Sequence, residues 1–147
     1  MAAIADHVAA ANAGTLDRAV CRLGSGWVVL GETQVRTGYC LLLADPVVGC
    51  LNDLDDAGRA AFLGDMAAVG DAVLAVTGCD RVNYGLLGNV VPELHAHVFP
   101  RGDEEPLPAR HEAVWRHDWG AAPPFSVARH GGLRDRLRAA LAGRAAG

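Results

Sequence analysis

The residues best suited to chemistry lie in one short stretch, residues 92–101. Side chains alternate between the two faces of a strand, so an extended chain here places Glu93, His95 and His97 on one face. The other face is small and apolar, as expected for a face packed on a core, with Leu94, Ala96 and Val98. An imidazole can act near neutral pH as a base, an acid, a nucleophile or a metal ligand. The spacing therefore predicts a strand with one reactive face and one core face.

Two imidazoles on one strand face are suited to the transfer of a phosphoryl group. A neutral imidazole is a competent nucleophile toward phosphorus, because the phosphoramidate that it forms is labile. A second imidazole two residues further on can bind the phosphate or protonate the leaving oxygen. A His-x-His pair beside a carboxylate is also a spacing for metal ligands such as those of Zn²⁺. The remaining histidines are expected to be surface or satisfied polar residues: His7, His111, His117 and His130.

The segments before this strand predict the sheet that holds it. Residues 27–30 and 38–44 are apolar and bounded by turn residues, which predicts two strands paired as a hairpin. Residues 81–84 should form another strand. A glycine-containing loop, residues 85–92, would turn it back into the histidine strand as an antiparallel pair.

Helical spacing appears in two places. From residue 55 to about residue 77, apolar residues recur every three or four positions and form one stripe: Phe62, Met66, Val69, Val73 and Val76. Aspartates precede this main helix and Gly78 supplies a stop. A final helix is expected over about residues 133–141. Residues 4–11 are either a short helix or a disordered lead, and residues 16–23 show no clear pattern.

Composition indicates a small protein with one core. The chain has 147 residues, of which 51% are hydrophobic and 20% charged, and this suits a single domain. Its four cysteines lack Cys-x-x-Cys spacing, so we expect reduced thiols and a cytoplasmic location. A net charge of -4 argues against general affinity for nucleic acid. No apolar run approaches membrane-spanning length and no basic signal-peptide lead is seen, so no membrane partner is expected. The arginine-rich end after residue 128 is interpreted as a solvated helix face.

Residues 88–101 resemble the histidine-triad (HIT) signature, a Gly-Gln/Asn pair followed by His-x-His-x-His and often Pro-Arg. With Gly88-Asn89 and Pro100-Arg101 aligned, His95 falls on the family's middle histidine and His97 on its last. Glu93 stands where the first histidine is expected. Gly88-Asn89 alone is typical of an ordinary turn, but beside the histidines and in this match it is better interpreted as part of an anion site.

The resemblance implies the architecture. We expect an α+β, HIT-like fold: an antiparallel sheet of about five strands with one main helix packed on it, followed by a C-terminal helix. Residues 1–147 would form a single domain, with a core at about 16–105 and a C-terminal extension at about 106–147. Relatives are commonly homodimers, so a homodimer is expected here.

The resemblance also implies a function. HIT proteins transfer or hydrolyse nucleoside monophosphoryl groups through a nucleotidyl-histidine, which would form here on His95. The substrate would be a purine nucleotide or nucleotide conjugate, joined as a phosphate ester, anhydride or phosphoramidate, and no metal or cofactor is required. His95, His97 and Glu93 would form the catalytic set. The expected substrate-binding residues are Asn83, Gly88, Asn89 and Tyr39, the last standing where many relatives have a fourth histidine.

Glu93 leaves alternatives open. A carboxylate beside imidazoles favours their protonated form, which weakens a nucleophile but strengthens a proton donor. The chain is then an active enzyme with altered pH dependence, a nucleotide-binding or sensor module with little turnover, or a His/Glu metal-binding protein. We favour the first, because the nucleophile position is intact. Trp115 and Trp119 can stack on a base, although tryptophan in a small domain more often packs structurally.

Overall fold

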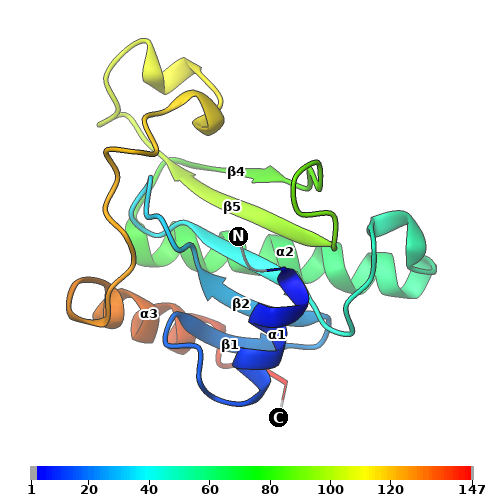
Figure 1. Ribbon diagram of the computed structural model, residues 1–147. Coiled ribbons are helices and arrows are strands. Elements are labelled where there is room, and N and C mark those ends of the chain that lie inside the picture. Colours follow the sequence, from blue (N-terminus) through cyan, green and yellow to red (C-terminus); the bar gives the residue numbers. More distant parts are fainter. Residues whose placement is uncertain (1–2, 147) are drawn as a thin grey trace.

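A five-stranded antiparallel sheet forms the centre of the protein. Figure 1 shows this sheet in a computed structural model, which describes residues 3–146. The strands lie in the order β1-β2-β3-β5-β4. Their bounds are β1 (Ala19–Leu23), β2 (Gly26–Leu30), β3 (Cys40–Ala44), β4 (Arg81–Gly85) and β5 (His95–Arg101). The predicted hairpin of β2 with β3 and the predicted pairing of β4 with β5 are both confirmed. Residues 19–23, which showed no clear pattern, form β1.

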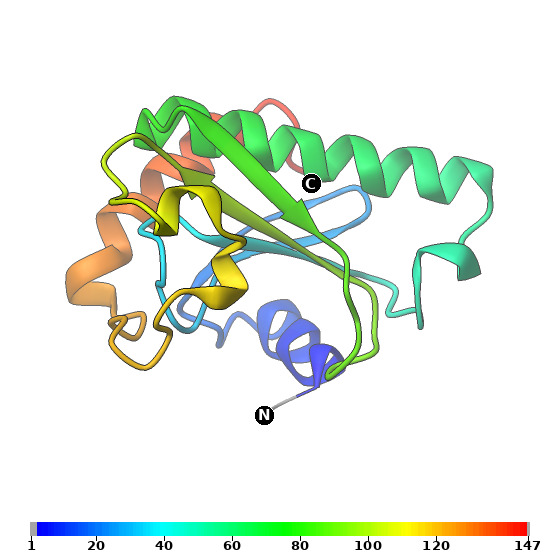
Figure 2. The ribbon, with the colours of Figure 1, turned by 90° about the horizontal axis from the view of Figure 1, so that it is seen from above.

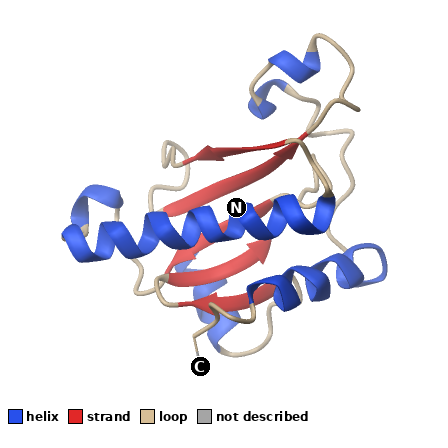
Figure 3. Cartoon of the chain, turned by 180° about the vertical axis from the view of Figure 1, so that it is seen from behind, coloured by secondary structure: helices blue, strands red, loops and turns tan. Residues whose placement is uncertain are grey.

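Helices cover both faces of the sheet. Figure 2 shows α1 (Ile4–Asn12) on one face, and α2 (Asp56–Thr77) with α3 (Val127–Leu141) on the other; Figure 3 shows these two from behind. Of the two expectations for residues 4–11, the helix is confirmed. The final helix begins at Val127 rather than near residue 133, because the Ser126 side chain accepts a hydrogen bond from the Arg129 N–H and caps it.

The main core lies between α2, α3 and the sheet. The predicted stripe is buried there: Phe62, Val69 and Val73 are fully enclosed, and Met66 and Val76 pack at its margin. α2 begins after Asp55, whose side chain accepts from the Gly58 N–H, and ends at Gly78, where φ is +68°. By length and composition α2 resembles a membrane-spanning helix, as the core helices of soluble proteins often do. Charged residues interrupt its apolar run, and its stripe packs on the sheet.

Two loop segments, one before α2 and one after β5, contain short 3₁₀ turns. A 3₁₀ turn, η1 (Leu51–Asp53), precedes α2. After β5 the chain continues into two further turns, η2 (Ala109–His111) and η3 (Val114–Arg116), which lie beyond the end of the strand (Figure 1). The four cysteines are free thiols, as expected.

Candidate active site

His95 and His97 lie on the sheet face that α1 covers. In the pairing of β3 with β5, Leu43 is opposite His95 and Leu41 is opposite His97, so these side chains share one face. Their neighbours Ala96 and Val98 point into the core on the α2 side. The predicted alternation is therefore correct within β5.

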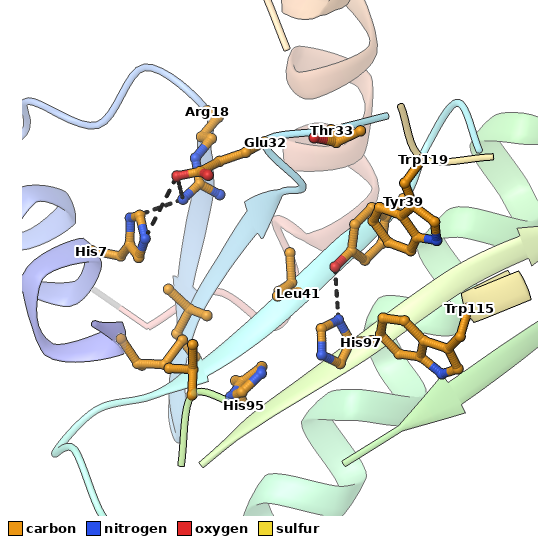
Figure 4. A pocket seen from close by; sticks show the side chains of 13 residues that line it. His7, Arg18, Glu32, Thr33, Tyr39, Leu41, His95, His97, Trp115 and Trp119 are labelled. Atoms are coloured by element: carbon orange, nitrogen blue, oxygen red, sulfur yellow. Dashed lines mark hydrogen bonds and ion pairs between the residues drawn. The ribbon is translucent and has the colours of Figure 1, made fainter. Parts of the chain in front are cut away.

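A cavity of about 470 Å³ opens over the two histidines. Its walls come from α1, from the inner strands and from the segment after β5 (Figure 4). Apolar and aromatic side chains predominate in these walls, and the polar groups gather at two ends. One end holds the histidines, and the other holds His7, Arg18 and Glu32.

The hydrogen bonding of His95 fixes which ring nitrogen is reactive. The residue is buried, with 8% of its surface exposed. Its Nδ1 lies 2.6 Å from the Glu93 carbonyl oxygen. A carbonyl can only accept a hydrogen bond, so Nδ1 carries the proton and the neutral ring keeps its lone pair on Nε2. That nitrogen has the electronic character of a nucleophile.

His97 has the opposite arrangement. Its Nδ1 lies 2.7 Å from the Tyr39 hydroxyl. Burial, together with the neighbouring His95, lowers the pKa of His97 to about 4, and burial raises the pKa of Tyr39. Both groups are therefore neutral at pH 7. A hydroxyl can donate or accept a hydrogen bond. When Tyr39 donates to Nδ1, the proton of His97 lies on Nε2, which then acts as a hydrogen-bond donor.

The structure places Glu93 just before the strand that holds the two histidines. β5 begins at His95, so Glu93 lies in the preceding loop, where strand alternation does not fix its side chain. It contributes its backbone carbonyl to His95, and it is not among the residues that line either cavity around His95. Burial and the neighbouring His95 lower the pKa of His97. The expected effect of the Glu93 carboxylate on the imidazoles stays a prediction.

The other predicted site residues separate into two groups. Tyr39 lines the main cavity, and Gly88, with φ +67°, lines a second cavity that also includes His95. Asn83 lies on β4 opposite Phe99, and its side-chain oxygen accepts from Arg101 at 2.9 Å. Asn89 is exposed. Neither asparagine is among the residues lining the two cavities.

Sequence reasoning missed the polar end of the main cavity. The Arg18 guanidinium is buried and lies 2.9 Å from the His7 Nδ1, 2.6 Å from the Leu30 carbonyl oxygen and 3.4 Å from Glu32. His7 was expected to be a surface or satisfied polar residue; it has polar partners, and it also forms part of the cavity wall. Its spacing from Ile4 and Val8, on the buried side of α1, is the signal that would have found it.

Two tryptophans close the cavity near His97. Trp115 and Trp119 stack with ring centroids 5.5 Å apart, and Trp115 meets the His97 ring edge-on at 4.7 Å. Both residues therefore pack structurally and also face the cavity. Arg101, at the end of β5, anchors their segment, because it contacts both Glu105 carboxylate oxygens and the Ala109 carbonyl.

The described residues do not group three or more His, Cys, Asp or Glu side chains in a way that would hold a metal ion. The site does combine a buried nucleophilic nitrogen, a neutral N–H donor, an aromatic wall and a glycine-containing loop. These are groups that can hold a phosphate ester and attack its phosphorus.

Comparison with known proteins identifies the fold. No protein-family model matches the chain, and no curated protein matches it in sequence. A histidine triad protein from Marinobacter aquaeolei is 19% identical, with 95% of this chain and 96% of that chain covered and a TM-score of 0.74. One from Bradyrhizobium japonicum is 24% identical, with 82% and 87% covered and a TM-score of 0.70. A hypothetical histidine triad nucleotide-binding protein from Sulfolobus tokodaii is 12% identical, with 94% and 92% covered and a TM-score of 0.72. The chain therefore has the fold of the histidine-triad proteins.

Proposed function

We propose, from the histidine-triad fold and the site within it, that this chain binds a purine nucleotide and transfers or hydrolyses its nucleoside monophosphoryl group through a covalent intermediate on His95. One observation carries the proposal. The contact between His95 Nδ1 and the Glu93 carbonyl leaves the lone pair on Nε2, at a residue that borders both cavities. The similarity to a nucleotide-binding histidine triad protein supports the ligand class.

The reaction has two displacements at phosphorus. With the nucleoside in the main cavity, His95 Nε2 attacks phosphorus and forms the P–N bond. The bond to the leaving atom breaks, and that atom keeps the electron pair and takes a proton from solvent. In hydrolysis, water then attacks phosphorus, the P–N electron pair returns to Nε2, and the proton of the water passes to solvent. In transfer, another hydroxyl or amine replaces water.

His97 serves this scheme best as a phosphate-binding donor. A ring with a pKa of about 4 is neutral at pH 7 and is a weak source of protons. Its Nε2–H can donate to a phosphate oxygen and stabilise the charge that develops there. Gly88 would add backbone polarity beside His95, and Asn83 and Asn89 would need to rearrange to reach the ligand.

The remaining expectations belong to the same proposal. We take residues 1–147 as one domain, with its core at about 16–105 and a C-terminal extension at about 106–147. The extension belongs to the same domain, because its helix α3 packs on the main core through Leu133, Leu137 and Leu141. A homodimer and a cytoplasmic location are proposed from the family resemblance and from the free thiols. Neither nucleic acid nor a membrane is proposed as a partner.

Calorimetric titration with AMP and GMP tests the proposal. Binding of at least one, followed by a nucleotidylated protein when an activated nucleotide is supplied, is the expected result. Binding without any turnover would favour a sensor module. Binding of neither nucleotide, with tight uptake of Zn²⁺, would favour the metal-binding alternative and overturn the proposal.

A further inference from the structure

The polar end of the main cavity, formed by His7, Arg18 and Glu32, lies across the sheet from the histidines of β5 (Figure 4). Glu32 follows the end of β2, and β2 is two strands away from β5 in the sheet. Neighbouring strands are about 4.8 Å apart, so about 10 Å separate β2 from β5. A nucleotide that places its phosphate at His95 therefore extends its base toward the polar end.

The wall between the two ends of the cavity is apolar. Leu41 and Leu43 of β3 form it together with Ile4 of α1 and Val91. The flat faces of a base gain from contact with such side chains. This contact does not distinguish one purine from another, because their ring faces are alike. Selection between purines must come from the polar groups at the end of the cavity.

The charges of the polar end cancel. The Arg18 Nη2 lies 2.9 Å from the His7 Nδ1 and 3.4 Å from the Glu32 Oε1. A guanidinium only donates hydrogen bonds, so the His7 Nδ1 accepts and the ring carries its proton on Nε2. One cation, one carboxylate and one neutral ring leave no net charge. The carboxylate would repel a further anionic group of a ligand, whereas an uncharged group with its own donors suits this end.

Glu32 is the member of this cluster that reaches the open cavity. Its side chain is 62% exposed, whereas that of Arg18 is 8% exposed. The contacts from Arg18 and from the His7 Nε2, the latter at 3.6 Å, are both with the Glu32 Oε1. A carboxylate has about four acceptor positions on its two oxygens. Glu32 can therefore accept further hydrogen bonds from a ligand, on Oε2 as well as on Oε1.

The two common purines differ in the groups that they offer to a carboxylate. Guanine has two adjacent donors, its N1–H and its 2-amino group, which match the two oxygens of one carboxylate. Adenine has one donor, its 6-amino group, beside an acceptor at N1. A carboxylate thus forms two charge-assisted hydrogen bonds with guanine. With adenine it forms one, and the N1 lone pair faces the other oxygen.

We propose that Glu32 selects guanine over adenine in the nucleotide that this chain binds. The selection rests on the proposed function, because it requires the nucleotide phosphate at His95. Arg18 and His7 are positioning residues, which hold Glu32 through its Oε1. Arg18 is itself held by the Leu30 carbonyl oxygen at 2.6 Å. The main cavity then reads the base at one end and holds the phosphate at the other.

Calorimetric titration with GMP, IMP and AMP tests this selection. IMP is the matched ligand, because its base differs from guanine only in lacking the 2-amino group. The wild-type protein should bind GMP about tenfold or more tightly than AMP, with IMP between them.

Glu32→Gln should remove the preference. A glutamine amide offers one donor group and one acceptor, which fit the edge of adenine better than that of guanine. The ratio of the Kd for AMP to the Kd for GMP should therefore fall by about tenfold. Because the ratio compares two ligands on the same protein, a partial loss of folded protein does not change it.

Glu104→Gln is the control variant. The Glu104 side chain is 66% exposed and also contacts an arginine, Arg36, but it does not line the main cavity. This variant should keep the wild-type ratio. Equal affinity of the wild-type protein for GMP and AMP would overturn the inference. An equal loss of both nucleotides in Glu32→Gln would also overturn it, because Glu32 would then bind the ribose hydroxyls. If none of the three nucleotides binds, the proposed function fails instead.

Discussion

At the scale of single residues, the two imidazoles present opposite groups through the same ring atom. His95 holds its proton on Nδ1, against the Glu93 carbonyl, and offers a lone pair on Nε2. His97 offers an N–H on Nε2 when the Tyr39 hydroxyl donates to its Nδ1. In the proposed reaction, His95 would therefore attack phosphorus and His97 would bind a phosphate oxygen.

Substitution of each histidine separates these roles. His95→Ala should abolish the nucleotidylated protein, because the attacking atom is gone. His97→Ala should slow formation of the adduct without relocating it, since it removes a phosphate contact. Mass spectrometry after an acid-free quench measures both. An adduct that survives in His95→Ala would refute the assignment of the nucleophile.

Tyr39→Phe tests the tautomer of His97. The ring contact with Phe99, at a centroid distance of 4.3 Å, would be kept, while the hydroxyl that fixes Nδ1 would be lost. We expect kcat/KM to fall by about tenfold, the equivalent of one hydrogen bond. Thermal melting of the variant serves as the control for folding. An unchanged kcat/KM would show that Tyr39 does not orient His97.

Protonation of His97 should also appear in stability. Its pKa is about 4 in the folded protein and 6.5 as the ordinary value, so between these pH values only the unfolded chain binds the proton. The contribution to the free energy of unfolding is fully present above about pH 6.5 and is lost as the pH falls toward 4. Allowing for partial exposure, it amounts to about 2 kcal/mol.

Urea unfolding of the wild-type protein and of His97→Gln, at pH 7 and pH 4.5, measures this contribution. The variant should lose less stability than the wild type over that interval, because glutamine does not titrate. Equal losses would show that His97 is not buried as a neutral ring.

At the scale of elements, β5 connects the two histidines to the aromatic wall of the cavity. Its last residue, Arg101, is buried against Glu105 and holds the turn that leads to Trp115. A buried charge that loses its partner is costly, whereas an exposed ion pair contributes little. The Arg101–Glu105 pair should therefore matter more than other ion pairs of the same segment.

Glu105→Gln should lower the free energy of unfolding by about 3 kcal/mol and weaken nucleotide binding, because the tryptophans lose their anchor. Glu112→Gln is the control, since Glu112 meets Arg116 at 4.0 Å on the surface. Tryptophan fluorescence during urea unfolding measures the free energy of unfolding of each variant, and the calorimetric titration with AMP and GMP measures nucleotide binding. Similar losses in the two variants would argue against a role for the buried pair.

Helical spacing predicted α2, and strand alternation predicted β5. The strands β2 and β3 were predicted from apolar runs bounded by turn residues, and β4 was predicted as the strand that the glycine-containing loop turns back. β1 was missed because its register shifts between Ala19 and Cys21, so its burial does not alternate. The start of α3 was missed because Gly131 and Gly132 interrupt its apolar spacing, and Ser126 was not recognised as its cap.

Spacing alone could predict site residues only where they are close in sequence, whereas Tyr39 was predicted from the family resemblance. His95 and His97 are two residues apart, and the strand period alone places them together. His7, Arg18 and Glu32 are separated by more than ten residues each, and only the packing of α1 on the sheet brings them to one cavity. Helical spacing places His7 near the buried side of α1, but no local pattern shows that these three residues meet.

At the scale of the whole molecule, the main cavity is formed by three distant parts of the chain. α1, the sheet and the segment after β5 each provide a wall (Figure 4). β4 is an edge strand, and its Tyr84 is 44% exposed. An unpaired edge with exposed aromatic surface is suited to association.

Light scattering should therefore find a species of about twice the 15.3 kDa of one chain. Tyr84→Lys, which places a charge on the edge strand, should shift the population toward monomer. A single species of 15.3 kDa at micromolar concentration would remove the homodimer from the proposal.

The position of Ala96 has a consequence for mutational scanning. It lies between the two histidines, is fully buried, and faces the side of the sheet that α2 and α3 cover. A larger side chain would press β5 away from α2 and displace both imidazoles. In a saturation library screened for turnover, Ala96 should be as intolerant as His95, although it touches no ligand. Intolerance at such positions would show that packing on the far face of the sheet controls the placement of the two imidazoles.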